Sequence, residues 1–433
     1  MIVSASGIRG VLNRDLFPSD LVGFARNFAE FTDSEAFLLA RDTRSTGGVI
    51  RRAVLGALLS RGASVTDCGI ISTPALFRES RVLNKPAIMV TASHNEPEFN
   101  GLKFIVDGSG IGADAFDRVV SWKPAAGRPF SQGVVKDLRR PSYDEALVGR
   151  FGEGSCEGVS VAMDLGGGAA IAHAATILKR LGARVLTMND AAGVFNRRID
   201  PIADDLLLLR KMVRENGCKI GLAFDCDGDR LAIVDNKGRK RSGDFMFTLA
   251  LSRLLAETRE KKVVVSVDTT QAVEEVVGKF HGEVSRSKVG EANVVSMMRN
   301  KGAILGGEGS SGGLIDGSFN WCRDSMLAAL TILCALKKDG VGVYEGVRSY
   351  HQVRLGVHVQ RSRAFRAMKS LASGHEGLET IDGIKLRLSS RSWVLIRPSG
   401  TEELVRVSAE AETEERAREI AEDYAARLKE LSR

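Results

Sequence analysis

Apolar and polar positions alternate along the chain in a pattern that occurs three times. Each time, an apolar run of strand length ends at an aspartate, a small-residue or polar turn follows, and a helical pattern leads to Gly-Ala or Gly-Glu and a second apolar run. The apolar runs that end at these aspartates span residues 37–42, 159–164 and 263–268. A strand, a helix and a second strand in this order form a parallel βαβ unit. The sequence therefore predicts three related α/β domains with largely parallel sheets.

The pattern changes after about residue 356. A helix is expected at 365–372, strands at 384–388, 393–396 and 404–408, and a charged helix at 414–428. These elements predict a fourth, smaller α+β domain. The length of 433 residues also requires several cores. We therefore expect domains at residues 1–150, 151–252, 253–355 and 356–433.

Composition restricts the class of protein. Apolar residues make up 44% of the chain and charged residues 27%, near the averages for soluble globular proteins, so a disordered or fibrous protein fits poorly. No apolar run approaches the roughly 18–20 residues of a membrane span, and the first residues lack a signal-peptide pattern. We therefore expect a cytoplasmic protein with no membrane partner. The six cysteines form no Cys-x-x-Cys pair, so neither a zinc site nor a disulfide framework is indicated.

The chain carries an excess of basic residues, 61 Lys and Arg against 54 Asp and Glu. Such an excess suits nucleic acid, an anionic membrane surface or small anionic substrates. The one dense basic cluster, residues 237–241, lies between an apolar run and Ser242-Gly243-Asp244, which predicts a solvated hairpin tip. Nucleic acid is therefore not an expected partner.

The most informative segment is Thr91-Ala92-Ser93-His94-Asn95, which follows an apolar strand at residues 87–90. Ser93 at the end of this strand is a candidate nucleophile. His94 beside it and Lys103 nearby supply proton carriers and an electropositive setting. A polar turn without a catalytic role is the alternative.

A second segment, Asp225-Cys226-Asp227-Gly228-Asp229-Arg230, follows the apolar run at residues 220–224. Alternate residues of an extended loop point the same way, so the three carboxylates can converge on one hard cation such as Mg²⁺. The alternative is an acidic turn whose carboxylates point into water. An EF-hand loop fits poorly, because Arg230 and Asn236 stand where that loop needs glycine and glutamate.

Two later segments are candidates for ligand binding. Residues 306–313 place five glycines around Glu308, Ser310 and Ser311, which suits a loop that approaches a polyhydroxyl ligand closely, although a flexible linker is the alternative. The segment at residues 397–402 begins with Arg397-Pro398-Ser399-Gly400-Thr401. Its arginine, hydroxyls and backbone N–H groups could form a phosphate cradle, and a turn between strands is the alternative.

Together these segments resemble the motifs of the α-D-phosphohexomutase family, which includes phosphoglucomutase/phosphomannomutase and phosphoglucosamine mutase. The motifs occur in the family's order, one per domain, and the resemblance covers essentially the whole chain, with archaeal members most similar. It implies three similar α/β domains with mainly parallel mixed sheets and a C-terminal α+β domain, with an active-site cleft between the four.

The resemblance also implies roles for individual residues. In the family, the serine that matches Ser93 is phosphorylated, and the residues matching Asp225, Asp227 and Asp229 hold Mg²⁺, which also contacts the phosphoserine. Residues matching Arg9, His94 and Lys103 surround the reacting group, with Lys103 as a general acid/base. The implied substrate contacts are Arg230, Lys288, Glu308, Ser310, Arg397, Ser399, Gly400 and Thr401.

The activity implied by the resemblance is that of an isomerase, which interconverts hexose 1-phosphate and hexose 6-phosphate through a hexose bisphosphate. One Mg²⁺ per chain and hexose 1,6-bisphosphate as activator are expected. Glucosamine, glucose and mannose stay open as the sugar, because Ser311-Gly312-Gly313 follow Ser310 where the family often has Ser-Gly-His. A hexose-bisphosphate synthase or phosphatase and a non-catalytic sugar-phosphate sensor are the alternative functions. A phosphosugar is the expected partner, and a homodimer is left open.

Overall fold

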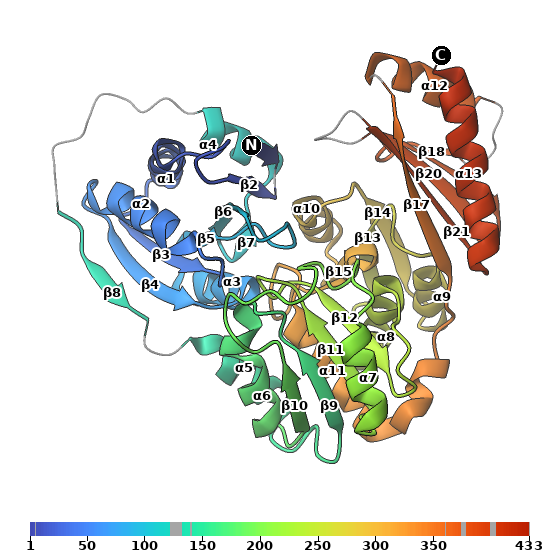
Figure 1. Ribbon diagram of the computed structural model, residues 1–433, viewed down its shortest axis with the longest axis horizontal. Coiled ribbons are helices and arrows are strands. Elements are labelled where there is room, and N and C mark those ends of the chain that lie inside the picture. Colours follow the sequence, from blue (N-terminus) through green and yellow to red (C-terminus); the bar gives the residue numbers. More distant parts are fainter. Residues whose placement is uncertain are drawn as a thin grey trace.

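The computed structural model describes residues 1–4, 6–121, 132–138, 141–359, 361–373, 378–398 and 404–432. Within these ranges the chain forms four sheets, each built from one region of the sequence (Figure 1). Of the helices in the described ranges, none combines the length and the apolar composition needed to cross a bilayer.

The first domain is a mixed sheet covered by helices. Its strands run in the order β1-β2-β6-β5-β3-β4-β8, and β7 pairs with β6. The strands are β1 (Ile2–Ser4), β2 (Gly7–Val11), β3 (Ala36–Arg41), β4 (Ser64–Ile70), β5 (Ala87–Val90), β6 (Phe99–Val106), β7 (Ser109–Gly110) and β8 (Val135–Asp137). The helices are α1 (Pro18–Thr32), α2 (Gly47–Leu59), α3 (Thr73–Leu83) and α4 (Ala113–Ser121).

The second and third domains have four-stranded sheets of the same design, in the orders β10-β9-β11-β12 and β14-β13-β15-β16. The second contains α5 (Ser142–Phe151), β9 (Ser160–Asp164), α6 (Ala174–Arg180), β10 (Arg184–Met188), α7 (Leu207–Glu215), β11 (Ile220–Phe224) and β12 (Leu231–Asp235). The third contains α8 (Gly243–Glu257), β13 (Lys262–Ser266), α9 (Ala272–Lys279), β14 (Glu283–Ser287), α10 (Glu291–Lys301), β15 (Leu305–Glu308), β16 (Gly313–Asp316) and α11 (Ser325–Asp339).

The three predicted crossovers are confirmed. The pairs β3 and β4, β9 and β10, and β13 and β14 are all parallel, and α2, α6 and α9 connect them. In each domain the first strand of the crossover also pairs with a third, parallel strand, and an antiparallel strand follows: β5 and β6, β11 and β12, β15 and β16. This shared strand order shows that the three domains repeat one topology.

The fourth domain is a five-stranded antiparallel sheet with two helices, as predicted in outline. The strand order is β17-β21-β20-β19-β18. The elements are β17 (His351–His358), α12 (Arg361–Ala372), β18 (Leu378–Glu379), β19 (Ile384–Ser389), β20 (Ser392–Pro398), β21 (Leu404–Ala411) and α13 (Glu414–Leu431). In Figure 1 this domain stands apart from the first, and α13 lies on the outer face of the sheet.

Two of the predicted domain limits fall inside elements. The division expected between residues 252 and 253 lies within α8, whose N-cap is Ser242. Nearly all of α8 is buried, so its sequence lacks the polar stripe that marks the beginning of a surface helix. The division expected between residues 355 and 356 lies within β17, which the sequence analysis missed because only two of its apolar side chains, Val353 and Val357, are buried.

The basic cluster at residues 237–241 forms the expected turn after β12, since Val234 and Lys240 are bridged antiparallel. Its side chains are less solvated than expected, however. Lys240 donates to two backbone carbonyls, and Arg239 and Arg241 both pair with Asp235. One carboxylate, that of Asp235, thus offsets part of the charge of the cluster within the second domain.

The first three domains share one continuous apolar core, to which strands and helices of each contribute. The fourth domain has its own core between its sheet and α12 and α13. A small apolar cluster connects the third and fourth domains and consists of Val267, Trp393 and Leu395, with Val289 packed against it.

Candidate active site

A cavity of about 640 Å³ lies where the four domains meet. Its wall combines residues from all four domains: Arg9 and His94, then Asp200 and Arg230, then Glu291, Glu308, Ser310 and Arg323, and finally Arg354, Arg397, Arg406 and Ser408. Residues from four separate sequence motifs are thus brought to a single cleft.

Ser93 lies just after β5, in the first domain. Its φ of 52° is in the left-handed region, which residues other than glycine rarely adopt and which is often found at functional sites. The buried hydroxyl donates to Asp225 Oδ2 at 3.3 Å and lies 3.4 Å from His94 Nδ1. The candidate nucleophile and the acidic loop of the second domain are therefore in direct contact.

The side chain of Arg44 binds the backbone of the loop that contains Ser93. This arginine is fully buried, and its Nε donates to Asp42 Oδ2 at 3.1 Å. Its Nη2 donates to the carbonyls of Ser93 and Asn95 at 2.7 and 2.6 Å, and Nη1 donates to two further carbonyls of the same segment. Sequence analysis missed this residue, because its partners lie about 50 positions away. Arg44 stabilises the strained loop that presents Ser93.

Replacing Arg44 by lysine is expected to lower the free energy of unfolding by on the order of 3 kcal/mol. A lysine keeps one charge but cannot reach five acceptors, so buried carbonyls lose their donors. Denaturant unfolding measures the change, and Arg14→Lys, at an exposed arginine of the same domain, is the control. A free energy within about 0.5 kcal/mol of wild type would contradict this role for Arg44.

Three aspartates of the second domain converge as predicted. Carboxylate oxygens of Asp225, Asp227 and Asp229 lie within 4.8 Å of one another, and all three side chains are fully buried. Oδ1 of Asp227 and Oδ1 of Asp229 accept no hydrogen bond from any described residue. A buried carboxylate oxygen without a donor is costly, and a hard cation removes that cost. The donor set therefore fits Mg²⁺.

The charges around these aspartates shift their pKa values in opposite directions. Burial, with repulsion from Asp229 and Asp227, raises the pKa of Asp225 well above its usual range. Burial also acts on Asp229, but the Arg323 guanidinium and the Lys103 ammonium outweigh it and lower the pKa of that carboxyl. The negative charge of Asp229 is thus strongly paired with cationic side chains, whereas the charge of Asp225 is poorly compensated by the protein alone.

Lys103 and His94 differ in protonation. Lys103 Nζ donates to Asp227 Oδ2 at 2.7 Å and to Asp229 Oδ2 at 3.0 Å. Burial opposes its charge, but these two carboxylates outweigh burial and raise the pKa of Lys103. Burial, followed by repulsion from Arg230 and Arg9, lowers the pKa of His94 below its usual range. Lys103 is therefore charged, whereas His94 is neutral.

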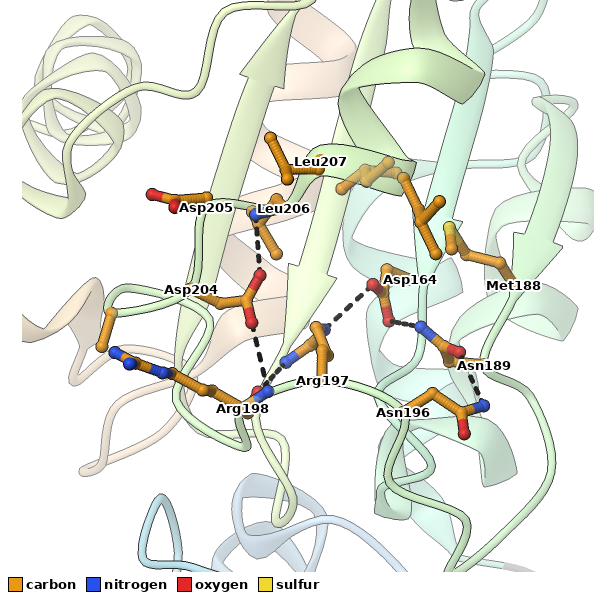
Figure 2. A pocket seen from close by; sticks show the side chains of 13 residues that line it. Asp164, Met188, Asn189, Asn196, Arg197, Arg198, Asp204, Asp205, Leu206 and Leu207 are labelled. Carbon is orange, nitrogen blue, oxygen red and sulfur yellow. Dashed lines mark hydrogen bonds and ion pairs between the residues drawn. The ribbon is translucent and has the colours of Figure 1, made fainter.

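A second cavity, of about 460 Å³, lies in the second domain, and Asp164, Asn189 and Arg197 are among the residues that line it (Figure 2). Arg197 crosses it, donating from Nε to Asp164 Oδ2 at 2.9 Å and from Nη2 to the carbonyl of Phe224 at 2.7 Å. Phe224 directly precedes Asp225. Arg197 thereby fixes the end of β11 at which the acidic loop begins. The side chain in this cavity thus has a structural role, which is to stabilise the loop.

The third-domain wall contains Glu308 and Ser310, as predicted. Glu308 is buried, its Oε1 accepts the N–H of Gly290 at 2.6 Å, and burial raises its pKa. Ser310 donates to Asp268 Oδ2 at 2.9 Å. Lys288, in contrast, is exposed and does not belong to the cavity wall, although the next three residues do.

Arg323 was missed as a site residue in the sequence analysis. Its Nη2 donates to Asp229 Oδ2 at 2.8 Å, and its Nη1 lies 3.3 Å from Glu308 Oε2. The side chain thus connects the acidic loop of the second domain to the wall of the third. Arg323 lies in the segment before α11, outside the four motifs from which the candidate site residues were predicted.

The fourth domain contributes a row of arginines. Arg397 on β20 lies directly opposite Arg406 on β21, and both line the cavity. Two like charges in this register repel each other, so the pair favours an anion between them. Arg397 Nη1 also lies 3.3 Å from Asp382 Oδ2. The predicted contacts Ser399, Gly400 and Thr401 lie outside the described residues.

Comparison with known proteins agrees with the four-domain fold. The four domain models of the phosphoglucomutase/phosphomannomutase family match in order: alpha/beta/alpha domains I, II and III at residues 1–121, 145–238 and 242–353, and the C-terminal domain at residues 357–427. The model boundary between the second and third domains lies ahead of α8, as in the structure.

Relatives match over nearly the whole chain. A probable phosphoglucosamine mutase of Methanopyrus kandleri is 32% identical over 97% of this chain and 96% of its own length. One from Pyrococcus abyssi is 30% identical, with 96% and 95% covered. The fold is similar to that of a phosphoglucomutase/phosphomannomutase family protein from Burkholderia thailandensis, with a TM-score of 0.84, 23% identity and 99% and 98% covered.

Four domains around one shared cleft define the phosphohexomutase class, and the enzyme is an isomerase. The chain belongs to the phosphoglucomutase/phosphomannomutase family, and the resemblance inferred from its motifs is confirmed.

Proposed function

We propose that the chain is a phosphoglucosamine mutase, which interconverts glucosamine 1-phosphate and glucosamine 6-phosphate. The observation that carries this proposal is the cavity that joins His94 and Arg230, which directly follow Ser93 and Asp229 in the sequence, to the arginines of the fourth domain. The names of the archaeal relatives support glucosamine as the sugar. A structural neighbour, N-acetylphosphoglucosamine mutase from Aspergillus fumigatus, was solved with GlcNAc-6P and magnesium; it has a TM-score of 0.62, 15% identity and 100% and 96% covered.

In the proposed reaction a phosphoryl group leaves Ser93 Oγ and bonds to a sugar hydroxyl oxygen, whose proton is released. Oγ of Ser93 in turn takes up a proton, which charged Lys103, the proposed general acid/base, can supply, while neutral His94 can accept the proton that the sugar releases. Arg9 and Arg230 line the same part of the cleft and offer positive charge to the transferring group. Mg²⁺ held by the three aspartates would neutralise charge on the phosphoryl oxygens.

The second half of the reaction requires the bisphosphate to reverse its orientation in the cleft, so that its other phosphate reaches Ser93. Glu308 and Ser310 are proposed to hold the sugar hydroxyls, and Arg397 with Arg406 to hold whichever phosphate is not reacting. The same arginines then serve both half-reactions. Hexose 1,6-bisphosphate is the proposed activator, because it regenerates the phosphorylated serine.

Replacing Arg397 by alanine is expected to lower kcat/KM by roughly 30- to 150-fold in both directions, since a charge-assisted contact to phosphate is lost. Lysine should restore only part, because it lacks the planar fork. Steady-state rates of the forward and reverse reactions measure this. Arg391→Ala, at an exposed arginine on the same hairpin, is the control. A kcat/KM within about twofold of wild type would show that the non-reacting phosphate is held elsewhere.

Assays with the 1-phosphates of glucosamine, glucose and mannose, each with and without added hexose bisphosphate, test the function as a whole. Mutase turnover that is stimulated by bisphosphate is the expected result. Net formation or hydrolysis of bisphosphate would instead indicate a synthase or phosphatase. Binding of the sugar phosphates without any turnover would indicate a sensor.

A further inference from the structure

The third-domain wall of the cleft carries two glutamates around a single arginine. Glu291, the first residue of α10, and Glu308, the last residue of β15, both line the cavity. The N–H of Gly290, which directly precedes Glu291, is bound to Glu308, so the two carboxylates belong to one connected segment. Arg323 lies between them.

The two glutamates differ in how many of their carboxylate oxygens have a hydrogen-bond or ion-pair partner. Both oxygens of Glu308 have partners, the N–H of Gly290 and Nη1 of Arg323. In Glu291, Oε2 accepts the backbone N–H of Arg323 at 2.9 Å and lies 3.3 Å from its Nε. Among the described residues, no donor is bonded to Oε1 of Glu291. The side chain is 16% exposed, so a ligand in the cleft can reach it.

Charge counting indicates what such a ligand would carry. A divalent cation together with Lys103 balances the three aspartates of the acidic loop. Asp268 also lines this wall, but the guanidinium of Arg354 offsets its charge, so Arg323 is left for Glu291 and Glu308 and the wall keeps one net negative charge. The parts of the cleft that hold phosphate are instead lined by arginines. A ligand with anionic ends and one positive charge on its ring matches this distribution.

We propose that Glu291 binds the ammonium group of an amino-sugar phosphate and thereby determines that the enzyme prefers glucosamine phosphates over the phosphates of neutral sugars. This inference rests on the proposed function and adds a residue to it. Because the sugar lies in two opposite orientations during the reaction, its ammonium group reaches Glu291 in one of them. The contribution of Glu291 to binding therefore differs between the two orientations of the sugar.

A purely structural role for Glu291, as the partner of Arg323, makes a different prediction. Loss of that ion pair would disturb Arg323, and with it Asp229 and Glu308, whatever the sugar. The value of kcat/KM would then fall by the same factor for all substrates. Recognition of an ammonium group instead affects only substrates that carry one.

The variant Glu291→Gln separates the two roles, because its amide oxygen still accepts the Arg323 N–H while the charge is removed. In wild type, kcat/KM for glucosamine 1-phosphate should exceed that for glucose 1-phosphate. In the variant, the value for glucosamine 1-phosphate should fall about tenfold through KM, and that for glucose 1-phosphate should stay within about twofold. Glu283→Gln, at an exposed glutamate of the same domain, should change neither.

A binding measurement keeps the test decisive if the variant turns over slowly. Calorimetric titration of the full chain with glucosamine 1-phosphate and with glucose 1-phosphate should show weaker binding of the amino sugar alone in Glu291→Gln. An equal loss for both sugars, or a wild type that uses glucose phosphates as well as glucosamine phosphates, would overturn the role of Glu291 and leave a phosphohexomutase. A wild type that turns over no hexose phosphate would instead refute the proposed function.

Discussion

Replacing Ser93 by alanine is expected to lower mutase turnover by at least roughly a thousandfold, because the chain then has no group to carry the phosphoryl between the two orientations of the sugar. The neighbouring hydroxyl of Thr91 cannot substitute, since it donates to Asp42 Oδ2 at 2.6 Å and accepts the N–H of Ser93. Steady-state turnover measures the loss, and the intact mass of the protein shows the phosphate adduct in wild type only.

Ser60→Ala is the control for this experiment, since Ser60 caps α2 in the same domain and donates to a local carbonyl. It should retain both the adduct and full turnover. Undiminished turnover by Ser93→Ala would show that another residue carries the phosphoryl group.

Removing the divalent cation is expected to abolish turnover, and added Mg²⁺ should restore it. The same cation should raise the melting temperature, because three buried carboxylates within 4.8 Å repel one another without it. Asp225→Asn tests both effects at once. Its Oδ1 can still accept the N–H groups of Asp229 and Arg230, while one negative charge is removed. In excess chelator this variant should therefore melt at a higher temperature than wild type although it is inactive.

The matched control is Asp423→Asn, at an exposed aspartate of α13 that pairs with Arg427. It should leave activity and the response to Mg²⁺ unchanged. Full activity of the wild type in excess chelator would contradict the assignment of a metal to the acidic loop, as would a melting temperature that does not respond to Mg²⁺.

Sequence patterns predicted those parts of the fold that depend on local order. The three crossovers follow from apolar runs that end at aspartates, and the structure has all three as parallel pairs. Two of the expected domain limits fall inside α8 and β17, because local polarity does not mark the beginnings of these elements. A largely buried helix such as α8 has no extended polar face, and β17 buries only two of its apolar side chains.

The candidate site shows the same division. Ser93 and the three aspartates were found from short motifs, and the structure brings Ser93 within hydrogen-bonding distance of Asp225. Their roles in the reaction stay predictions. Arg44 and Arg323 could not be found in this way, because the acceptors that explain them lie in segments distant in the sequence, and only the folded chain brings their guanidinium groups to these acceptors.

The separate core of the fourth domain has a consequence for how this enzyme can change over generations. The residues proposed to carry the phosphoryl group rest on the core shared by the first three domains, whereas Arg397 and Arg406 project from a sheet with a core of its own. Substitutions that repack the core of the fourth domain can therefore alter the affinity for the substrate without moving the residues proposed to carry the phosphoryl group. The division of cores makes affinity open to selection independently of chemistry.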